Sequence, residues 1–278
     1  KNTVVNTAIN KAKQRAVVIC PGRGTYNKEE LGYLQRLHRD KTEIISLIDD
    51  YRDSQGQVKV SELDSMDNYS MRVHTAGENA SALIYACALA DYQAINRDQF
   101  DIVAVTCNSM GWYIALAVKL GLKALEALLP VAQDRYPMNL FNHAAFHTPL
   151  LNDVSTRAMS LMSAKMFTTP AVPLIDGLGQ VWQPYSCNTE QLYNYTLDTQ
   201  VVAPYNFSKA IEVAIKEFAP DKLIILGPGA TLGGAVAQSL ISHQWLNLQT
   251  KADFIAQQKQ DPFILAMGLA EQRRQVVE

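Results

Sequence analysis

The sequence has little cysteine and carries no pattern typical of a metal site. Its four cysteines, Cys20, Cys87, Cys107 and Cys187, form no Cys-x-x-Cys pair and lack the spacing of zinc ligands. The chain also lacks a His-Glu-x-x-His motif and any cluster of His, Cys and Asp. We therefore expect no metal, and we expect buried free thiols in a reducing compartment.

A strong excess of one charge and a long apolar run are also absent. The 25 basic and 27 acidic residues leave a net charge of −2, whereas a general nucleic-acid binder usually has a basic excess. The longest weakly polar stretch, residues 80–90, is far shorter than the about 20 residues that span a bilayer. Residues 1–15 are polar and basic, unlike a signal peptide, and predict an N-terminal lead-in. We expect a cytoplasmic protein without nucleic-acid or membrane partners.

The 278 residues alternate short apolar runs with longer stretches of helical periodicity. Because 48% of them are hydrophobic and 19% charged, the composition is that of a globular protein. The polar stretch 49–69 predicts a surface connection with a short helix at most. The alternation predicts an α/β fold with a mainly parallel sheet. Strands are predicted at 16–20, 102–106, 139–146, 171–176 and 222–226, and helices at 28–37, 75–95, 112–118, 122–129, 205–218 and after Gly229.

The segment Cys107-Asn108-Ser109-Met110-Gly111 has the arrangement of a nucleophile elbow, a serine on a sharp turn between a strand and a helix. Such a turn lifts the serine hydroxyl clear of the sheet, and the N–H groups of the next helix face developing negative charge. The segment departs from Gly-x-Ser-x-Gly because Cys107 replaces the first glycine. The alternative interpretation is a strand end whose serine caps the next helix.

A nucleophilic serine needs a base within hydrogen-bonding reach. Of the five histidines, we expect His38 and His243 at the surface, and His74 to cap a helix or face a cleft. His147 ends an apolar run and precedes a chain reversal, and side chains at the carboxyl ends of strands line the functional crevice of an α/β sheet. We therefore predict His147 as the base; a packing histidine is the alternative, and His143 is the weaker candidate.

Four segments, in this order along the chain, resemble motifs of the malonyl-CoA:acyl-carrier-protein transacylases and polyketide-synthase acyltransferase domains. Residues 18–25 resemble the F-P-G-Q-G-S loop of that family, and residues 108–111 resemble its G-H-S-x-G elbow. Residues 145–150, Ala-Phe-His-Thr-Pro-Leu, resemble its histidine motif, and residues 226–229 resemble its late Gly-Pro-Gly turn. The resemblance covers nearly the whole chain.

This resemblance implies a hydrolase-like parallel-sheet core and a Ser–His dyad that transfers an acyl group in two steps. Ser109 would attack the thioester of an acyl-CoA while His147 takes its proton, and the phosphopantetheine thiol of an acyl carrier protein would then accept the acyl group. Both thioesters are substrates, and no cofactor is expected. The backbone N–H groups of Arg23 and Met110 would hold the oxyanion, and Asn206 would orient the histidine.

Three positions near the implied site differ from the family. Arg23 stands where the family has glutamine; this keeps the backbone N–H and adds a charge that can meet a carboxylate or a CoA phosphate, or pair with an acid. Asn108 replaces the elbow histidine, and Trp112 replaces a glutamate. Both are candidates for shaping the acyl pocket, although packing on the sheet is the favoured interpretation of Trp112.

The largest difference is the spacing of 38 residues between Ser109 and His147. The family has a small ferredoxin-like subdomain there, and residues 119–138 resemble a remnant of it, between core segments 16–118 and 139–278. Either the protein is truly shortened or the sequence omits a segment, and the flanks, which resemble the two cut ends of an insert, favour omission. The arginine that binds the malonyl carboxylate in the family has no match, because Arg135 falls in the wrong place.

The sequence therefore predicts an acyltransferase similar to the carrier-protein malonyltransferases, in fatty-acid or polyketide biosynthesis, with an acyl carrier protein and an acyl-CoA as partners. Two alternatives stay open. A carrier-protein thioester hydrolase would use the same dyad and release the acyl group to water, and the unmatched arginine favours it. A non-catalytic module that docks a carrier protein is favoured by the altered elbow.

Overall fold

The computed structural model describes residues 12–120 and 145–278 of the chain. Six strands form one sheet in the order β4-β3-β2-β1-β5-β6. Neighbouring strands are parallel except β3 and β4, which are antiparallel. This confirms the predicted α/β fold with a mainly parallel sheet. The strands are β1 (Gln14–Cys20), β2 (Phe100–Cys107), β3 (Leu174–Ile175), β4 (Val181–Trp182), β5 (Lys222–Ile225) and β6 (Ile264–Ala266).

Helices connect the strands and cover the sheet. The α-helices are α1 (Tyr33–Leu37), α2 (Thr42–Ser54), α3 (Val60–Asp64), α4 (Met71–His74), α5 (Gly77–Ala94), α6 (Gly111–Leu120), α8 (Asn152–Leu161), α9 (Thr189–Asn194), α10 (Gln200–Val202), α11 (Phe207–Phe218), α12 (Leu232–Ser242), α13 (Lys251–Gln260) and α14 (Ala270–Val277). Short 3-10 helices are η1 (Lys28–Glu30), η2 (Pro149–Leu151), η3 (Ala164–Met166) and η5 (Trp245–Asn247), and a π-helix, η4, covers Tyr195–Thr199. Within the described ranges, no helix has both the length and the apolar character that crossing a membrane requires.

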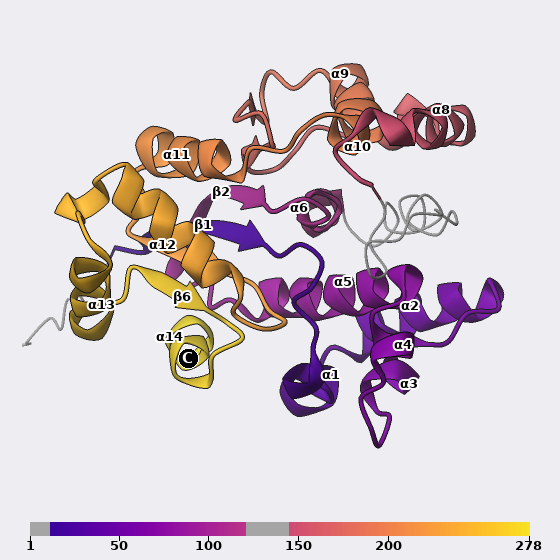
Figure 1. Cartoon of the computed structure of the whole chain (residues 1–278), viewed down its shortest axis with the longest axis horizontal. Helices are drawn as coiled ribbons and strands as arrows, with labels where there is room; N and C mark the ends of the chain where they lie inside the picture. The colour runs from indigo at the N-terminus through magenta and orange to yellow at the C-terminus, as the bar shows by residue number, and fades with distance from the viewer. Residues whose placement is uncertain (1–11, 121–144) are drawn as a thin grey trace, which may run out of the picture.

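The central strand β1 is apolar on both faces because both faces of the sheet are covered. Ala16 and Val18 belong to a buried cluster that includes residues of α5 and α6. Val17 and Ile19 belong to a second buried cluster that includes residues of α11 and α12. Figure 1 shows β1 and β2 between α5 and α11. A strand buried in this way reads as a continuous apolar run, which is why the sequence predicts it well.

Most predicted elements are present, and two predictions need correction. The helix predicted at 28–37 is divided into η1 and α1 at Gly32, whose φ of 82° interrupts the helical path. The stretch 49–69 contains the predicted short helix, α3, and exposed residues around it, but it also contains the end of α2 and several buried side chains, so it is only in part a surface connection. Arg52 is buried there and donates hydrogen bonds to the carbonyls of Val58 and Glu78 and to Asn79 Oδ1. Its polar atoms are therefore satisfied inside the protein.

Several predictions fall partly or wholly outside the described residues. The helix predicted at 122–129, His143, Arg135 and most of the expected subdomain remnant lie there. Of the strand predicted at 139–146, only Ala145 and Phe146 are described, and they are not in a strand. At the other end of the chain, β1 begins at Gln14, two residues before the predicted core.

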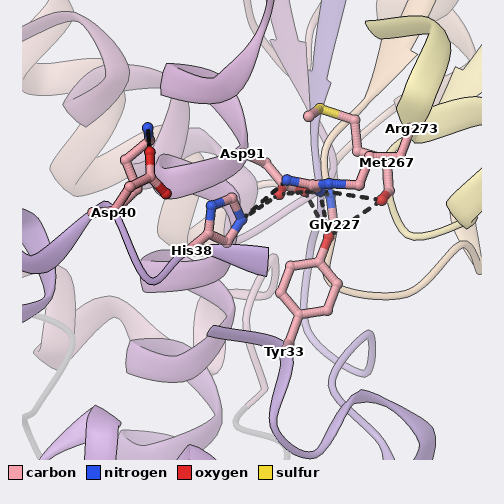
Figure 2. Close-up of polar contacts among 8 residues, drawn as sticks. Tyr33, His38, Asp40, Asp91, Gly227, Met267 and Arg273 are labelled. Atoms are coloured by element: carbon pink, nitrogen blue, oxygen red, sulfur yellow. Dashed lines mark hydrogen bonds and ion pairs between the residues drawn. The ribbon is translucent and has the colours of Figure 1, made fainter. Parts of the chain in front are cut away.

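A buried polar network joins distant parts of the chain (Figure 2). Asp91 of α5 accepts at Oδ1 from Arg273 Nη1, at 2.6 Å, and lies 2.7 Å from His38 Nε2. Its Oδ2 accepts from the Tyr33 hydroxyl at 2.8 Å and from the Gly227 N–H at 2.7 Å. His38 and Asp91 are both fully buried, so the prediction of a surface position for His38 is wrong. The carboxylate that contacts His38 Nε2 lies 53 residues away and is invisible to local sequence patterns.

Candidate active site

The turn after β2 has the geometry of a nucleophile elbow. Ser109 is half-buried and adopts a left-handed conformation with a φ of 50°, which costs a non-glycine residue about 1–2 kcal/mol. Helix α6 begins two residues later, at Gly111. The Trp112 N–H donates to the carbonyl of Ser109 at 3.0 Å. The serine therefore stands on a strained turn between a strand and a helix N-terminus, as the sequence predicts.

Two glycines let the turn pack against the loop that follows β1. A Cβ at Gly111 would lie 2.5 Å from the carbonyl oxygen of Cys20 and 2.8 Å from that of Pro21. A Cβ at Gly22 would lie 2.8 Å from the carbonyl oxygen of Asn108. Both distances are too short for a side-chain carbon, so glycine is needed at each position. This close approach brings the Arg23 loop beside the elbow.

Cys107 occupies the position of the missing first glycine, and its side chain is accommodated. The thiol is fully buried, with Sγ 3.0 Å from the hydroxyl oxygen of Tyr205. The same hydroxyl donates to the Cys107 carbonyl at 2.6 Å. Burial raises the pKa of the Cys107 thiol to about 12. The thiol therefore stays protonated at neutral pH and does not compete with Ser109 as a nucleophile.

Ser109 and His147 are in contact. Ser109 Oγ lies 2.6 Å from His147 Nε2, across 38 residues of sequence. His147 is half-buried and, like the serine, adopts a left-handed conformation, with a φ of 64°. Its N–H donates to the carbonyl of Val201 at 2.7 Å, and its ring centroid lies 5.3 Å from that of Tyr205. A neutral imidazole in this position can accept the serine proton.

Burial lowers the pKa of His147 below its ordinary value of 6.5. The main chain at Gln200 and Ala203 lies beside the imidazole and acts in the opposite direction, but the effect of burial is larger. The lowered pKa keeps the ring neutral at physiological pH. This is the protonation state that a general base requires.

The side chain of Arg23 extends toward the start of α5. Its Nη2 donates to the carbonyl of Thr75 at 3.1 Å, and its guanidinium lies near the position a Cβ of Gly77 would occupy. Burial lowers the pKa of this guanidinium. The residue is partly exposed beside the elbow, and its backbone belongs to the loop that packs on Asn108.

The other predicted site residues have different placements. Met110 lies in the elbow itself, directly before α6, and Asn108 is half-buried beside Gly22. Trp112 is fully buried, and its Nε1 donates to Thr196 Oγ1 at 3.0 Å while its ring packs edge-on against Tyr195. This environment agrees with the packing interpretation of Trp112.

Asn206 does not have the position expected of a residue that orients His147. It is exposed and forms the N-cap of α11, where its Oδ1 accepts from the Lys209 N–H at 2.9 Å. Its own N–H donates to Gly177, and its carbonyl accepts from Ala210. The main chain beside the imidazole instead belongs to residues 200–203, which precede Asn206 in the chain.

Sequence reasoning missed the residues that contact the dyad from this segment. Gln200 is 3% exposed, and its Nε2 donates to the carbonyl of Ser109 at 2.8 Å. Val201 and Tyr205 contact His147 as described above. No local pattern marks Gln200, whose partner lies 91 residues away in the chain.

The other three described histidines have their contacts elsewhere in the fold. His38 contacts Asp91, and His243 is the C-cap of α12. His74 is buried and lies within hydrogen-bonding distance of main-chain atoms of Ser70 and Leu63.

Comparisons with solved structures identify the fold. The Coxiella burnetii malonyl CoA-acyl carrier protein transacylase matches with a TM-score of 0.66 and 14% identity, over 95% of this chain and 96% of that one. The Synechocystis malonyl-CoA:ACP transacylase matches with a TM-score of 0.64 and 15% identity, over 95% and 100%. This chain has the malonyl-CoA:acyl-carrier-protein transacylase fold.

A third transacylase-fold structure contains two proteins. It is a type II polyketide-synthase acyl-carrier protein in complex with its malonyl-transacylase, and it matches with a TM-score of 0.63 and 13% identity, over 94% of this chain and 97% of that one. No family model and no curated protein sequence matches the chain. The similarity to the transacylases is therefore one of fold, at low sequence identity.

Proposed function

We propose that this protein transfers an acyl group, with malonyl as the leading candidate, from CoA to the phosphopantetheine thiol of an acyl carrier protein through an acyl-Ser109 intermediate. The observation that carries the proposal is the 2.6 Å contact between Ser109 Oγ and His147 Nε2 at the carboxyl end of β2. The transacylase fold supports it independently. The carrier-protein complex among the structures with this fold supports the choice of acceptor.

In the first step, Ser109 Oγ attacks the thioester carbonyl of the acyl-CoA while His147 Nε2 accepts the hydroxyl proton. The tetrahedral intermediate collapses, the carbon–sulfur bond breaks, and the CoA sulfur leaves with the proton held by His147. In the second step, the carrier thiol gives its proton to His147 and attacks the acyl-serine. The serine oxygen then takes the proton back, and the acyl group remains on the carrier.

The backbone N–H groups of Met110 and Arg23 are our candidates for the oxyanion donors. Met110 directly precedes α6, where helix N–H groups favour negative charge. The Arg23 loop packs against the elbow through Gly22. A donor of this kind is worth a factor of about 10²–10³ in rate. Asn108, half-buried in the elbow, remains the candidate for contact with the acyl group.

The compartment proposed for this reaction is the cytoplasm. All four cysteines are free, and three of them are buried, as expected of a protein in a reducing environment.

The test is intact mass spectrometry after brief incubation with malonyl-CoA and, separately, with acetyl-CoA. We expect a malonyl adduct that disappears in Ser109→Ala and persists in Ser160→Ala, which removes an exposed serine hydroxyl on α8. Addition of a phosphopantetheinylated carrier protein should then move the adduct to the carrier. An adduct retained by Ser109→Ala would contradict the proposal.

The same measurement separates the alternatives left open by the sequence. Release of free malonate with no acylated carrier would indicate the hydrolase. An acetyl adduct without a malonyl adduct would keep the nucleophile and exclude malonyl as the acyl group. Carrier binding without any adduct and without release of CoA would indicate the docking module.

A further inference from the structure

The segment from η4 to α11 contacts both members of the Ser–His pair. The Gln200 side chain donates to the carbonyl of Ser109 at 2.8 Å, and the next residue, Val201, accepts at its carbonyl from the His147 N–H at 2.7 Å. Ser109 and His147 both have left-handed backbones, a conformation that neighbouring contacts must hold in place. One dipeptide therefore restrains the backbone of the nucleophile and that of the base.

The Ser109 carbonyl accepts from Gln200 Nε2 and from the Trp112 N–H, and its orientation also controls a second group. The carbonyl of Ser109 and the N–H of Met110 belong to one planar peptide unit, and in a trans peptide they point in opposite directions. A donor that holds the carbonyl at one end therefore sets the direction of the N–H at the other end. That N–H is a proposed oxyanion donor, and a hydrogen bond on the carbonyl side also strengthens it as a donor.

The surrounding hydrogen bonds fix the orientation of the Gln200 amide. The Tyr195 hydroxyl accepts from the Gly177 N–H at 2.9 Å, so its own proton is directed to Gln200 Oε1, at 3.0 Å. With Oε1 occupied as an acceptor, the NH₂ group of Gln200 faces the Ser109 carbonyl, which can only accept. The chain from Gly177 through Tyr195 and Gln200 to Ser109 therefore has one consistent assignment of donors and acceptors.

We infer that Gln200 is a positioning residue for the acyl-transfer site: its buried amide, oriented by Tyr195, holds the Ser109–Met110 peptide so that the Met110 N–H points at the developing oxyanion. The inference rests on the proposed function in taking Ser109 as the nucleophile, but it does not depend on the identity of the acyl group. Gln200 is 3% exposed, so it acts through the elbow rather than by binding substrate at the surface.

The test uses a fluorophosphonate, which reports on an activated serine whatever its natural acyl donor. Ser109 Oγ forms a bond to phosphorus, fluoride leaves, His147 accepts the hydroxyl proton, and the phosphoryl oxygen occupies the oxyanion position. Gln200→Leu removes the amide at similar size. We expect its maximal labelling rate to fall by about 10–100-fold with little change in the probe concentration at half-maximal rate, because binding is preserved and transition-state stabilisation is lost.

Two further variants separate positioning from stability. Tyr195→Phe leaves the Gln200 amide in place but removes the group that orients it, so an intermediate loss of the labelling rate is expected. Tyr193→Phe is the matched control: its hydroxyl donates to the carbonyls of Met159 and Met162 and touches neither Ser109 nor His147. It should lower the melting temperature and leave the labelling rate of the folded protein within about two-fold.

The outcomes distinguish this inference from the proposed function. A wild-type protein that is labelled by the fluorophosphonate but not by malonyl-CoA would contradict the proposed acyl group and leave the role of Gln200 testable by the probe. Labelling of Gln200→Leu at the wild-type rate would overturn the positioning role, even if malonyl transfer is observed. A wild-type protein that neither reagent labels at Ser109 would overturn both.

Discussion

At the scale of single residues, His147 has the environment of a base. Its Nε2 contacts Ser109 Oγ, and its partial burial disfavours the imidazolium form. The thiol at Cys107, in contrast, is buried so completely that it stays protonated. Burial thus has opposite consequences at two neighbouring titratable groups: it keeps the histidine available as a proton acceptor and makes the cysteine inert.

The lowered pKa of His147 predicts the pH dependence of Ser109 acylation. As pH falls, the rate should drop only when the ring becomes protonated, so the midpoint should lie below 6.5. Because the unfolded chain binds this proton more readily than the folded one, the histidine should also reduce the free energy of unfolding as pH falls through about 6.5.

The measurement is the rate of fluorophosphonate labelling between pH 4.5 and pH 8. His243→Gln is the matched control: His243 directly follows α12 as its C-cap, and its replacement should leave the midpoint unchanged. A wild-type midpoint at or above 6.5 would contradict the predicted shift.

Asn206 supplies a second prediction at the residue scale. Because its side chain caps α11, Asn206→Ala should lower the free energy of unfolding by about 1 kcal/mol in a denaturant titration. The labelling rate of Ser109 should change little, since the Asn206 hydrogen bonds are directed to Lys209, Gly177 and Ala210. A large loss of labelling with unchanged stability would instead support the orienting role that the sequence resemblance implies.

At the scale of elements, the site depends on the contact between the loop after β1 and the start of α6. These segments follow two neighbouring parallel strands, whose carboxyl ends meet at one edge of the sheet. The residues Cys20 and Cys107, which end the two strands, are direct partners in the register. The elbow and the proposed oxyanion loop are adjacent because of this pairing.

Gly111→Ala tests this contact. The added methyl would lie 2.5 Å from a main-chain carbonyl oxygen, so α6 or the loop must shift, at a cost of about 1–3 kcal/mol in stability. The labelling rate of Ser109 should fall as well, because the elbow moves. Both are measured on the same purified variant, by denaturant titration and by fluorophosphonate labelling.

Gly234→Ala is the control for this substitution. Gly234 lies in α12, is exposed, and has open space where the methyl would be placed. The helix propensity of alanine should stabilise this variant by up to about 1 kcal/mol without changing the labelling rate. Equal effects of the two substitutions would show that the contact at Gly111 is not what matters.

At the scale of the whole molecule, the Asp91 network connects segments that are far apart in sequence. Tyr33 and His38 follow β1, Asp91 comes from α5, Gly227 follows β5 and Arg273 comes from the C-terminal helix α14. All of these contacts converge on one buried carboxylate, as Figure 2 shows. The network thereby ties the last helix of the chain to the core.

Arg273→Met should be strongly destabilising. It leaves Asp91 as a buried carboxylate without its arginine, at a cost of about 3–5 kcal/mol in the free energy of unfolding. Arg274→Met is the matched control on the same helix, since Arg274 is exposed and pairs with the exposed Glu271. That substitution should change stability by less than about 0.5 kcal/mol. Similar midpoints for the two variants in a denaturant titration would contradict the prediction.

Much of the core and part of the site follow from local sequence patterns. Continuous apolar runs predict β1, β2 and β5, and the Ser-Met-Gly turn between a strand and a helix predicts the elbow at Ser109. The end of an apolar run and a motif resemblance predict His147 as the base, and the structure places its Nε2 in contact with Ser109 Oγ across 38 residues of sequence. The strand predicted at 171–176 is present only as the two-residue β3, and the two-residue strand β4 and the π-helix η4 carry no comparable local signal.

The sequence by itself determined the layered α/β fold and the strained turn under Ser109, because burial on two faces and a strand-to-helix turn are properties of adjacent residues. Only the tertiary structure decided which groups satisfy the buried polar atoms. Asp91 accepts from residues up to 182 positions away, and Gln200 reaches a carbonyl 91 positions away. Such partners are selected by the packing of elements in space, so no local pattern contains them.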